Sequence, residues 1–193
     1  MQFARFKNTS QRNAMKQTLI VLSALLILFS CKKEVDELPA ATQTGANTFG
    51  ARVKGELWTP QGFGVVLTAP ILEASYSGNN AILINARNFN TSPTETEIEI
   101  YLQNATRPGT YLLNQATAHF PNHNASYAYY VERRFTPTNE WITNNQYVGK
   151  VEVTRLDTVN NIISGTFEFN AINLYNTPQP ITITDGRFDI KIQ

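Results

Sequence analysis

Three glutamates spaced two residues apart, Glu95, Glu97 and Glu99, have the arrangement in this sequence best suited to acid and base chemistry. In a β-strand such residues share one face, with neighbouring side chains about 6–7 Å apart. Carboxylates at that spacing could bind calcium or divide the acid and base roles of a glycoside hydrolase. Because Ile98 and Ile100 form an apolar opposite face, we expect the glutamates to face water and to discourage pairing between sheet edges.

The two histidines, His119 and His123, have the spacing that on a helix presents both imidazole rings to one zinc ion. Pro121 lies between them and opposes a helix. No cysteine accompanies them, and no glutamate lies between them. We therefore expect a polar loop here, and neither a bound metal nor a cofactor.

Aromatic side chains are the third group that could bind a ligand. Tyr127 and Tyr129 share one face of a predicted strand, which is typical of a core. Trp58, Tyr130 and Trp141 lie outside that stripe, so they are the candidate ligand-binding residues. If exposed, they would stack on sugar rings; packing in the core or in loops is the alternative.

The sequence has no glycine-rich phosphate loop, no Gly-x-Ser-x-Gly elbow and no paired cysteines. We assign no catalytic residue and expect no enzyme activity. The formal net charge is +1, so a nucleic-acid partner is not expected.

The only cysteine, Cys31, ends an apolar run of residues 19–29 that follows a basic stretch. This run is too short to span a bilayer, for which about 20 residues are needed, and has the length of a secretory signal. Leu28-Phe29-Ser30-Cys31 resembles a bacterial lipobox. The resemblance implies that residues 1–30 are a signal peptide, starting at Met1 or Met15, and that lipid on Cys31 anchors the protein to a membrane, because several acyl chains bind stably.

Residues 31–46 are predicted to be the lipidated cysteine and a flexible tether, and residues 47–193 one domain. Lys32 stands directly after the cysteine, where an inner-membrane retention signal would place aspartate. The outer membrane is therefore the expected location, with its periplasmic and surface faces both open. Beyond residue 30 the chain carries 12 basic and 15 acidic residues, whereas all the charged side chains of residues 1–30 are basic.

Residues 47–193 alternate apolar and polar side chains with a period of two, which predicts half-buried strands. Strands are expected over residues 49–57, 81–89, 97–103, 125–135, 147–156 and 162–174. Asp185-Gly186 predicts a hairpin turn between residues 181–184 and 187–190. The fold class is all-β, an antiparallel sandwich or a barrel-like closed sheet of about eight or nine strands.

The two ends of the predicted domain resemble an uncharacterised family of Bacteroidota lipoproteins. The resemblance rests on Val53-Lys54-Gly55-Glu56-Leu57-Trp58 with the residues before it, on Gly165-Thr166-Phe167-Glu168-Phe169, and on residues 181–189. It implies a secreted, lipid-anchored, all-β domain and no known activity. We therefore expect a non-catalytic ligand-binding or structural module of the cell envelope, with a glycan or an envelope protein as partner. A divergent glycan-active hydrolase or a carbohydrate-binding accessory protein is the alternative.

Overall fold

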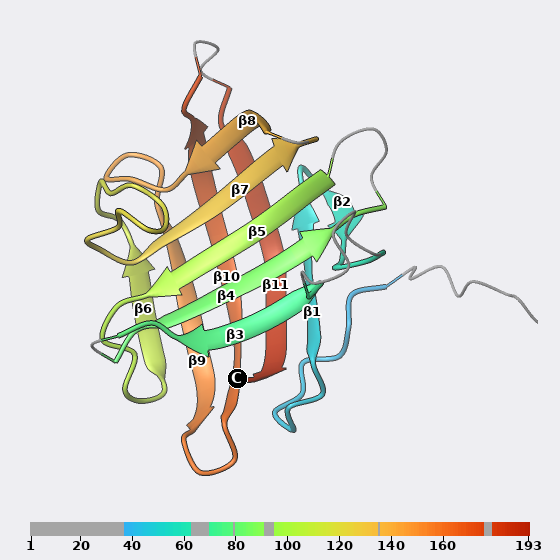
Figure 1. Cartoon of the computed structure of the whole chain (residues 1–193), viewed down its shortest axis with the longest axis vertical. Helices are drawn as coiled ribbons and strands as arrows, with labels where there is room; N and C mark the ends of the chain where they lie inside the picture. The colour runs from blue at the N-terminus through green and yellow to red at the C-terminus, as the bar shows by residue number, and fades with distance from the viewer. Residues whose placement is uncertain (1–36, 63–69, 79, 91–94, 135, 176–178) are drawn as a thin grey trace, which may run out of the picture. The chain divides into compact units, whose positions relative to one another are not determined.

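The computed structural model describes residues 37–62, 70–78, 80–90, 95–134, 136–175 and 179–193 (Figure 1). The chain divides into two units, Met1–Val35 and Asp36–Gln193, and all the described residues belong to the second. The predicted signal peptide, Cys31 and the first residues of the predicted tether lie outside the described residues. Within the ranges above, no helix has the length and apolar character needed to cross a membrane.

The described residues form eleven strands and no helix, so the prediction of an all-β antiparallel domain is confirmed. The strands are β1 (Thr48–Val53), β2 (Glu56–Trp58), β3 (Leu72–Tyr76), β4 (Ile82–Asn88), β5 (Glu95–Leu102), β6 (Gly109–Leu113), β7 (Tyr127–Arg133), β8 (Pro137–Ile142), β9 (Gly149–Asp157), β10 (Ile162–Asn173) and β11 (Ile181–Lys191). The predicted number was too low partly because residues 49–57 are not one strand. The chain turns back at Lys54 and Gly55, which both have positive φ.

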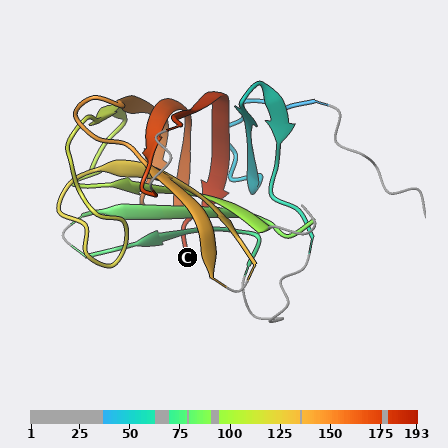
Figure 2. The ribbon, with the colours of Figure 1, turned by 90° about the horizontal axis from the view of Figure 1, so that it is seen from above.

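The strands form two layers that cross each other (Figures 1 and 2). The first sheet has the order β2-β1-β11-β10-β9-β6, and the second has the order β3-β4-β5-β7-β8. The end of β10 joins the sheets, because Ile172 and Asn173 pair with β8. β2 and β3 stand at the two ends of the strand order, so the sheet is not closed and the fold is sandwich-like.

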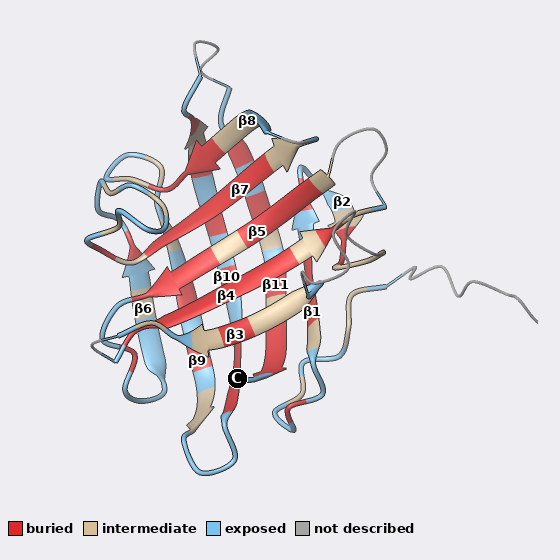
Figure 3. Cartoon of the chain, viewed as in Figure 1, coloured by how far each residue is buried: buried red, intermediate tan, exposed pale blue. Residues whose placement is uncertain are grey.

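Apolar side chains fill the space between the sheets. Phe49 packs there against Phe167, with ring centroids 5.1 Å apart, and against Trp58 at 5.9 Å. A second, smaller cluster covers the opposite face of the second sheet; its members are Ala81, Leu83, Tyr101, Tyr127, Tyr129, Val131 and Ile142. The central strands of the second sheet, β4, β5 and β7, are therefore buried on both faces, as their mostly red colour shows (Figure 3).

The prediction of a hairpin at Asp185-Gly186 is wrong. β11 runs without interruption from Ile181 to Lys191 between β1 and β10. Asp185 adopts φ 53°, and the pairing register with both neighbours shifts beside it, so the dipeptide forms a bulge. Pairing on both sides of the strand outweighs the local turn preference.

A buried aspartate ties the segment before β1 to the first sheet. Asp189, which is 1% exposed, accepts six hydrogen bonds. The donors are the Thr42, Thr44 and Ser164 hydroxyls and the backbone N–H groups of Thr44, Gly45 and Ala46. Burial by itself would raise the pKa of Asp189, but these hydrogen bonds outweigh burial and hold the pKa below its ordinary value. The last part of the predicted tether is thus bound to the domain.

Replacement of Asp189 by alanine is expected to lower the free energy of unfolding by about 2–4 kcal/mol, because buried donors lose their acceptor. Denaturant unfolding at pH 7 measures this change. The control is Asp185→Asn on the same strand. Asp185 is exposed and pairs with Arg52 at 3.7 Å, so a change below about 0.5 kcal/mol is expected.

The Asp189→Ala substitution is also expected to change how the stability of the fold depends on pH. The folded-state pKa of Asp189 lies below the unfolded value of about 3.9, so its carboxylate stabilises the fold above that value and the stabilisation is lost as the pH falls through the folded pKa. The Asp189→Ala variant is expected to lack this part of the acid destabilisation. Equal effects of the Asp189 and Asp185 substitutions would contradict the assigned role.

Candidate functional site on the outer face of the second sheet

The glutamate row of β5 lies on the outer face of the second sheet, the face covered by the smaller apolar cluster. The expectation that these side chains face water is wrong for Glu97, which is 6% exposed, and Glu95 and Glu99 are both half-buried. Tyr127 and Tyr129 of β7 and residues of the 114–126 segment lie over this face, which excludes water from the row.

Glu97 is held between two arginines. Arg87 lies directly opposite it on β4, with Nε 3.3 Å from Oε1, and the Arg133 guanidinium donates to Oε2. Arg87 also reaches Glu73 of β3, with its Nη2 atom 2.7 Å from Oε1. A buried carboxylate is tolerated when opposite charges and hydrogen bonds replace its water. Four side chains of four neighbouring strands therefore form one ion-pair cluster.

One amide connects Glu97 to Glu99. The Asn85 amide lies between the two glutamates, and the amide orientation that satisfies its neighbours has the nitrogen donating to Glu97 Oε1 at 3.0 Å and to Glu99 Oε2 at 3.1 Å. The other oxygen of Glu99 accepts a hydrogen bond from the Tyr127 hydroxyl. The same hydroxyl accepts from the backbone N–H of Phe120 at 2.7 Å, which fixes the 114–126 segment over the sheet.

The two carboxylates have different electrostatic surroundings. Burial raises the pKa of Glu99, and the charge of Glu97 raises it further, while the hydrogen bond from Tyr127 opposes the shift. Burial and the neighbouring Glu99 also raise the pKa of Tyr127. Glu97, in contrast, faces two positive charges. Two carboxyl groups in different surroundings are the arrangement that divides acid and base roles in some enzymes.

Glu140 of β8 is another carboxylate on this face that binds several side chains. Its carboxylate accepts hydrogen bonds from the Tyr129 hydroxyl and, at 2.9 Å, from the Tyr175 hydroxyl. His119 stacks on Tyr129, with ring centroids 4.5 Å apart, and its Nε2 lies 3.7 Å from Glu140 Oε1. This part of the network lies closer to solvent, since the Tyr175 side chain is exposed.

The histidines lie in irregular chain, as predicted. His123 stacks on Tyr101, with ring centroids 3.9 Å apart, and burial lowers its pKa. His119 stacks on a different tyrosine, Tyr129, so the two imidazole rings pack against different side chains. Among the residues that the structure describes, no three or more His, Cys, Asp or Glu side chains converge so that they could hold a metal ion.

The aromatic residues selected as candidate ligand contacts are in the core. Trp58, Tyr130 and Trp141 are 5%, 4% and 5% exposed, so they do not form the exposed platform that sugar stacking requires. Trp58 Nε1 donates to Thr96 Oγ1 at 2.9 Å, and Trp141 stands 5.5 Å from the Tyr130 ring. The reason is strand alternation: Tyr130 points to the space between the sheets, and the stripe of Tyr127 and Tyr129 points to the other face.

Sequence reasoning found the glutamates of β5 but not their partners. Asn85 and Arg87 share a face of β4 with buried Leu83, and this polar pair beside an apolar residue was the only local signal. It does not reveal that Asn85 stands opposite Glu99 and Arg87 opposite Glu97, because that depends on register. Glu140 and Tyr175 meet through contacts between segments distant in sequence.

In a comparison with known protein families, a family model described as a domain of unknown function (DUF6252) matches residues 48–189. No curated protein and no solved structure matches the chain.

Substitution of Glu97 by glutamine is expected to destabilise the fold by about 2–4 kcal/mol, because Arg133 loses its counterion and Arg87 keeps only Glu73. Glu168→Gln is the matched control: its ion pair with Lys150 joins side chains that are 57% and 51% exposed, and a change below about 1 kcal/mol is expected. Thermal and denaturant unfolding measure both variants.

The Glu99→Gln substitution on the same strand is expected to affect stability differently from Glu97→Gln. Because burial raises the pKa of Glu99, its charge opposes folding near neutral pH, and its removal is expected to leave stability unchanged or raised. A Glu97→Gln variant as stable as the parent protein would contradict the structural role of the ion-pair cluster.

Proposed function

The chain belongs to the family described as a domain of unknown function (DUF6252), and on this premise we propose that it is a lipid-anchored outer-membrane protein of Bacteroidota type that binds or scaffolds and does not catalyse. The anchor is the lipidated Cys31. The partner is a glycan or another envelope protein, and the membrane face is either the periplasmic or the outer one.

The anchor is supported by the position of the cysteine in the sequence. Cys31 is the only cysteine, and it stands at the end of the apolar run of residues 19–29 behind Leu28-Phe29-Ser30. The folded domain therefore uses no disulfide and no thiolate ligand, and its stability depends on packing and on buried polar contacts such as those of Asp189. A cysteine with no task in the domain is available for lipidation.

One observation carries the non-catalytic part of the proposal: the buried and half-buried carboxylates of the outer face are engaged by the domain itself. Glu97 is paired with two arginines, Glu99 with Asn85 and Tyr127, and Glu140 with two tyrosines. A general acid or base must instead reach a substrate atom within hydrogen-bond distance. These groups hold together β3, β4, β5, β7 and β8.

Mass spectrometry of the protein from its native membrane tests the anchor. The expected product begins at Cys31 and carries a diacylglyceryl thioether and an N-terminal acyl chain. Cys31→Ser is expected to retain the leader and to lose partition into the detergent phase, because it lacks the thiol that is acylated. A wild-type protein with a free Cys31 thiol, or with residues 1–30 still attached, would refute the anchor.

A glycan-active hydrolase is the second candidate function, and the observation that favours it is the raised pKa of Glu99 next to a second carboxyl group, Glu97, on the same strand face. Incubation of the purified protein with a panel of envelope and plant polysaccharides is expected to release no reducing sugar. Hydrolysis by the parent protein that disappears in the Glu99→Gln variant would replace the binding proposal with the hydrolase. The Glu168→Gln variant serves as the control for that comparison.

A further inference from the structure

β6 forms one edge of the first sheet. Its five residues, Gly109–Leu113, pair with β9, and within the described ranges no other strand pairs with them. The edge strands at the ends of the strand order are better protected. β2 has three residues, and β3 carries Glu73 and receives a hydrogen bond from the Gln193 N–H to Ala74 O at 2.9 Å.

The side chains of β6 lack the usual protection against pairing with another chain. Natural sheet edges commonly carry charges, a bulge or a proline within the strand. β6 reads Gly-Thr-Tyr-Leu-Leu, with no charged residue, and Pro108 stands just before it. Leu112 is 58% exposed, and most of the strand is exposed (Figure 3). The strand therefore presents both an unpaired backbone edge and an apolar side chain to solvent.

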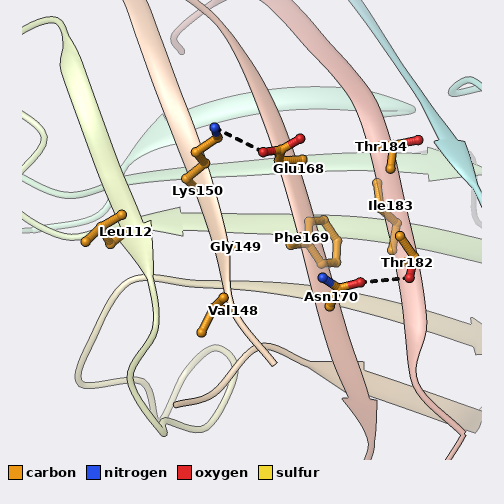
Figure 4. A pocket seen from close by; sticks show the side chains of 10 residues that line it. All are labelled: Leu112, Val148, Gly149, Lys150, Glu168, Phe169, Asn170, Thr182, Ile183 and Thr184. Atoms are coloured by element: carbon orange, nitrogen blue, oxygen red, sulfur yellow. Dashed lines mark hydrogen bonds and ion pairs between the residues drawn. The ribbon is translucent and has the colours of Figure 1, made fainter. Parts of the chain in front are cut away.

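An open groove of 430 Å³ lies on the outward face of the first sheet, across β9, β10 and β11, and Leu112 is the residue of β6 that borders it (Figure 4). Leu112 and Val148, which is 44% exposed, form its apolar wall. The polar groups that line it are already paired: Lys150 Nζ lies 3.0 Å from Glu168 Oε1, and Thr182 donates to Asn170 at 2.7 Å. The surface offered to a ligand here is consequently apolar.

A second groove, of 590 Å³, lies at the first half of the strand. It is lined by Asn104, Thr106, Arg107 and the start of β6. Within the part of the chain that the structure describes, the Arg107 guanidinium makes no ion pair, while its carbonyl accepts from the Tyr111 hydroxyl at 2.6 Å. This end of the edge is therefore polar and positively charged.

We propose that the β6 edge binds an extended segment of a partner polypeptide, which adds a strand beside β6. The backbone edge fits a strand, because only another extended backbone matches its row of N–H and C=O groups. The segment places an apolar side chain against the exposed Leu112 and an acidic side chain near Arg107. Five residues of β6 span about 17 Å, so a segment of about six residues fits.

A second copy of the chain fits this edge less well. Antiparallel pairing of two β6 strands would bring Arg107 of one copy near residues 113–117 of the other. Residues 103–119 contain no aspartate or glutamate, so that arrangement supplies no counterion for Arg107. The charge of the edge therefore favours a different polypeptide. This inference deepens the binding role proposed above and rests on it.

The test uses the full-length protein in detergent and an array of fluorescent, end-capped hexapeptides that alternate threonine with leucine. The residue facing Arg107 is aspartate in one set and lysine in the other. Fluorescence anisotropy is expected to show binding of the aspartate set, with at least tenfold weaker binding of the lysine set. Hydrogen exchange of the β6 amides is expected to slow when an aspartate peptide is bound.

Substitutions at the two ends of the edge locate the site. Leu112→Lys is expected to weaken binding at least tenfold, and Arg107→Glu is expected to reverse the preference between the two peptide sets. Val159→Lys is the matched control, since Val159 is an apolar side chain 88% exposed in the turn between β9 and β10 and lines neither groove, and unchanged binding is expected. N-methylation of the peptide backbone is expected to abolish binding without any change to the protein.

Three results would overturn the proposal: an array in which no peptide binds at millimolar concentration, binding that Leu112→Lys leaves unchanged, or a concentration-dependent dimer that Leu112→Lys dissociates. The last would identify a second copy as the occupant. A negative array together with a lipidated Cys31 and no hydrolysis would remove this inference and leave the proposed function in place. A free Cys31 thiol would remove the anchor and leave the peptide measurements unaffected.

Discussion

Burial of the second sheet on both faces is the constraint on which the candidate site depends. Apolar side chains of β4, β5 and β7 face the space between the sheets, and tyrosines and residues of the 114–126 segment cover the opposite face. Water is thereby removed from a face that carries several charges. Because an unpaired charge there would cost several kcal/mol, each buried carboxylate must find a partner on a neighbouring strand. The ion-pair cluster around Glu97 and the hydrogen bonds of Glu99 meet this requirement.

The same requirement operates at Asp189 on the first sheet. There the partners are hydroxyls and backbone N–H groups of residues 42–46, so one buried carboxylate extends the domain beyond the first strand. Under the proposed anchor, this shortens the free connection between the membrane and the domain. Buried polar contacts thus replace the disulfides that many exported domains use.

The two sheets differ in what they offer to other molecules. The outer face of the second sheet is occupied by its own tyrosines, glutamates and arginines. The first sheet has an outward face of exposed side chains such as Lys150 and Glu168, and at β6 it ends in an uncharged edge. A binding surface is therefore better sought on the first sheet, although the acidic row of the second sheet was the more conspicuous feature of the sequence.

The sequence by itself determined the all-β class and the face shared by Glu95, Glu97 and Glu99, because alternation along a strand is a local property. The expected strands over residues 147–156 and 162–174 also placed the connection between β9 and β10, where Asp157 accepts from the Val159 and Asn160 N–H groups. Only the tertiary structure decided that Asp185-Gly186 forms a bulge, that Tyr130 points inward and that Glu97 is buried. These outcomes depend on which strands pair, in which register and under which covering segment, and such contacts between distant residues leave no trace in local spacing.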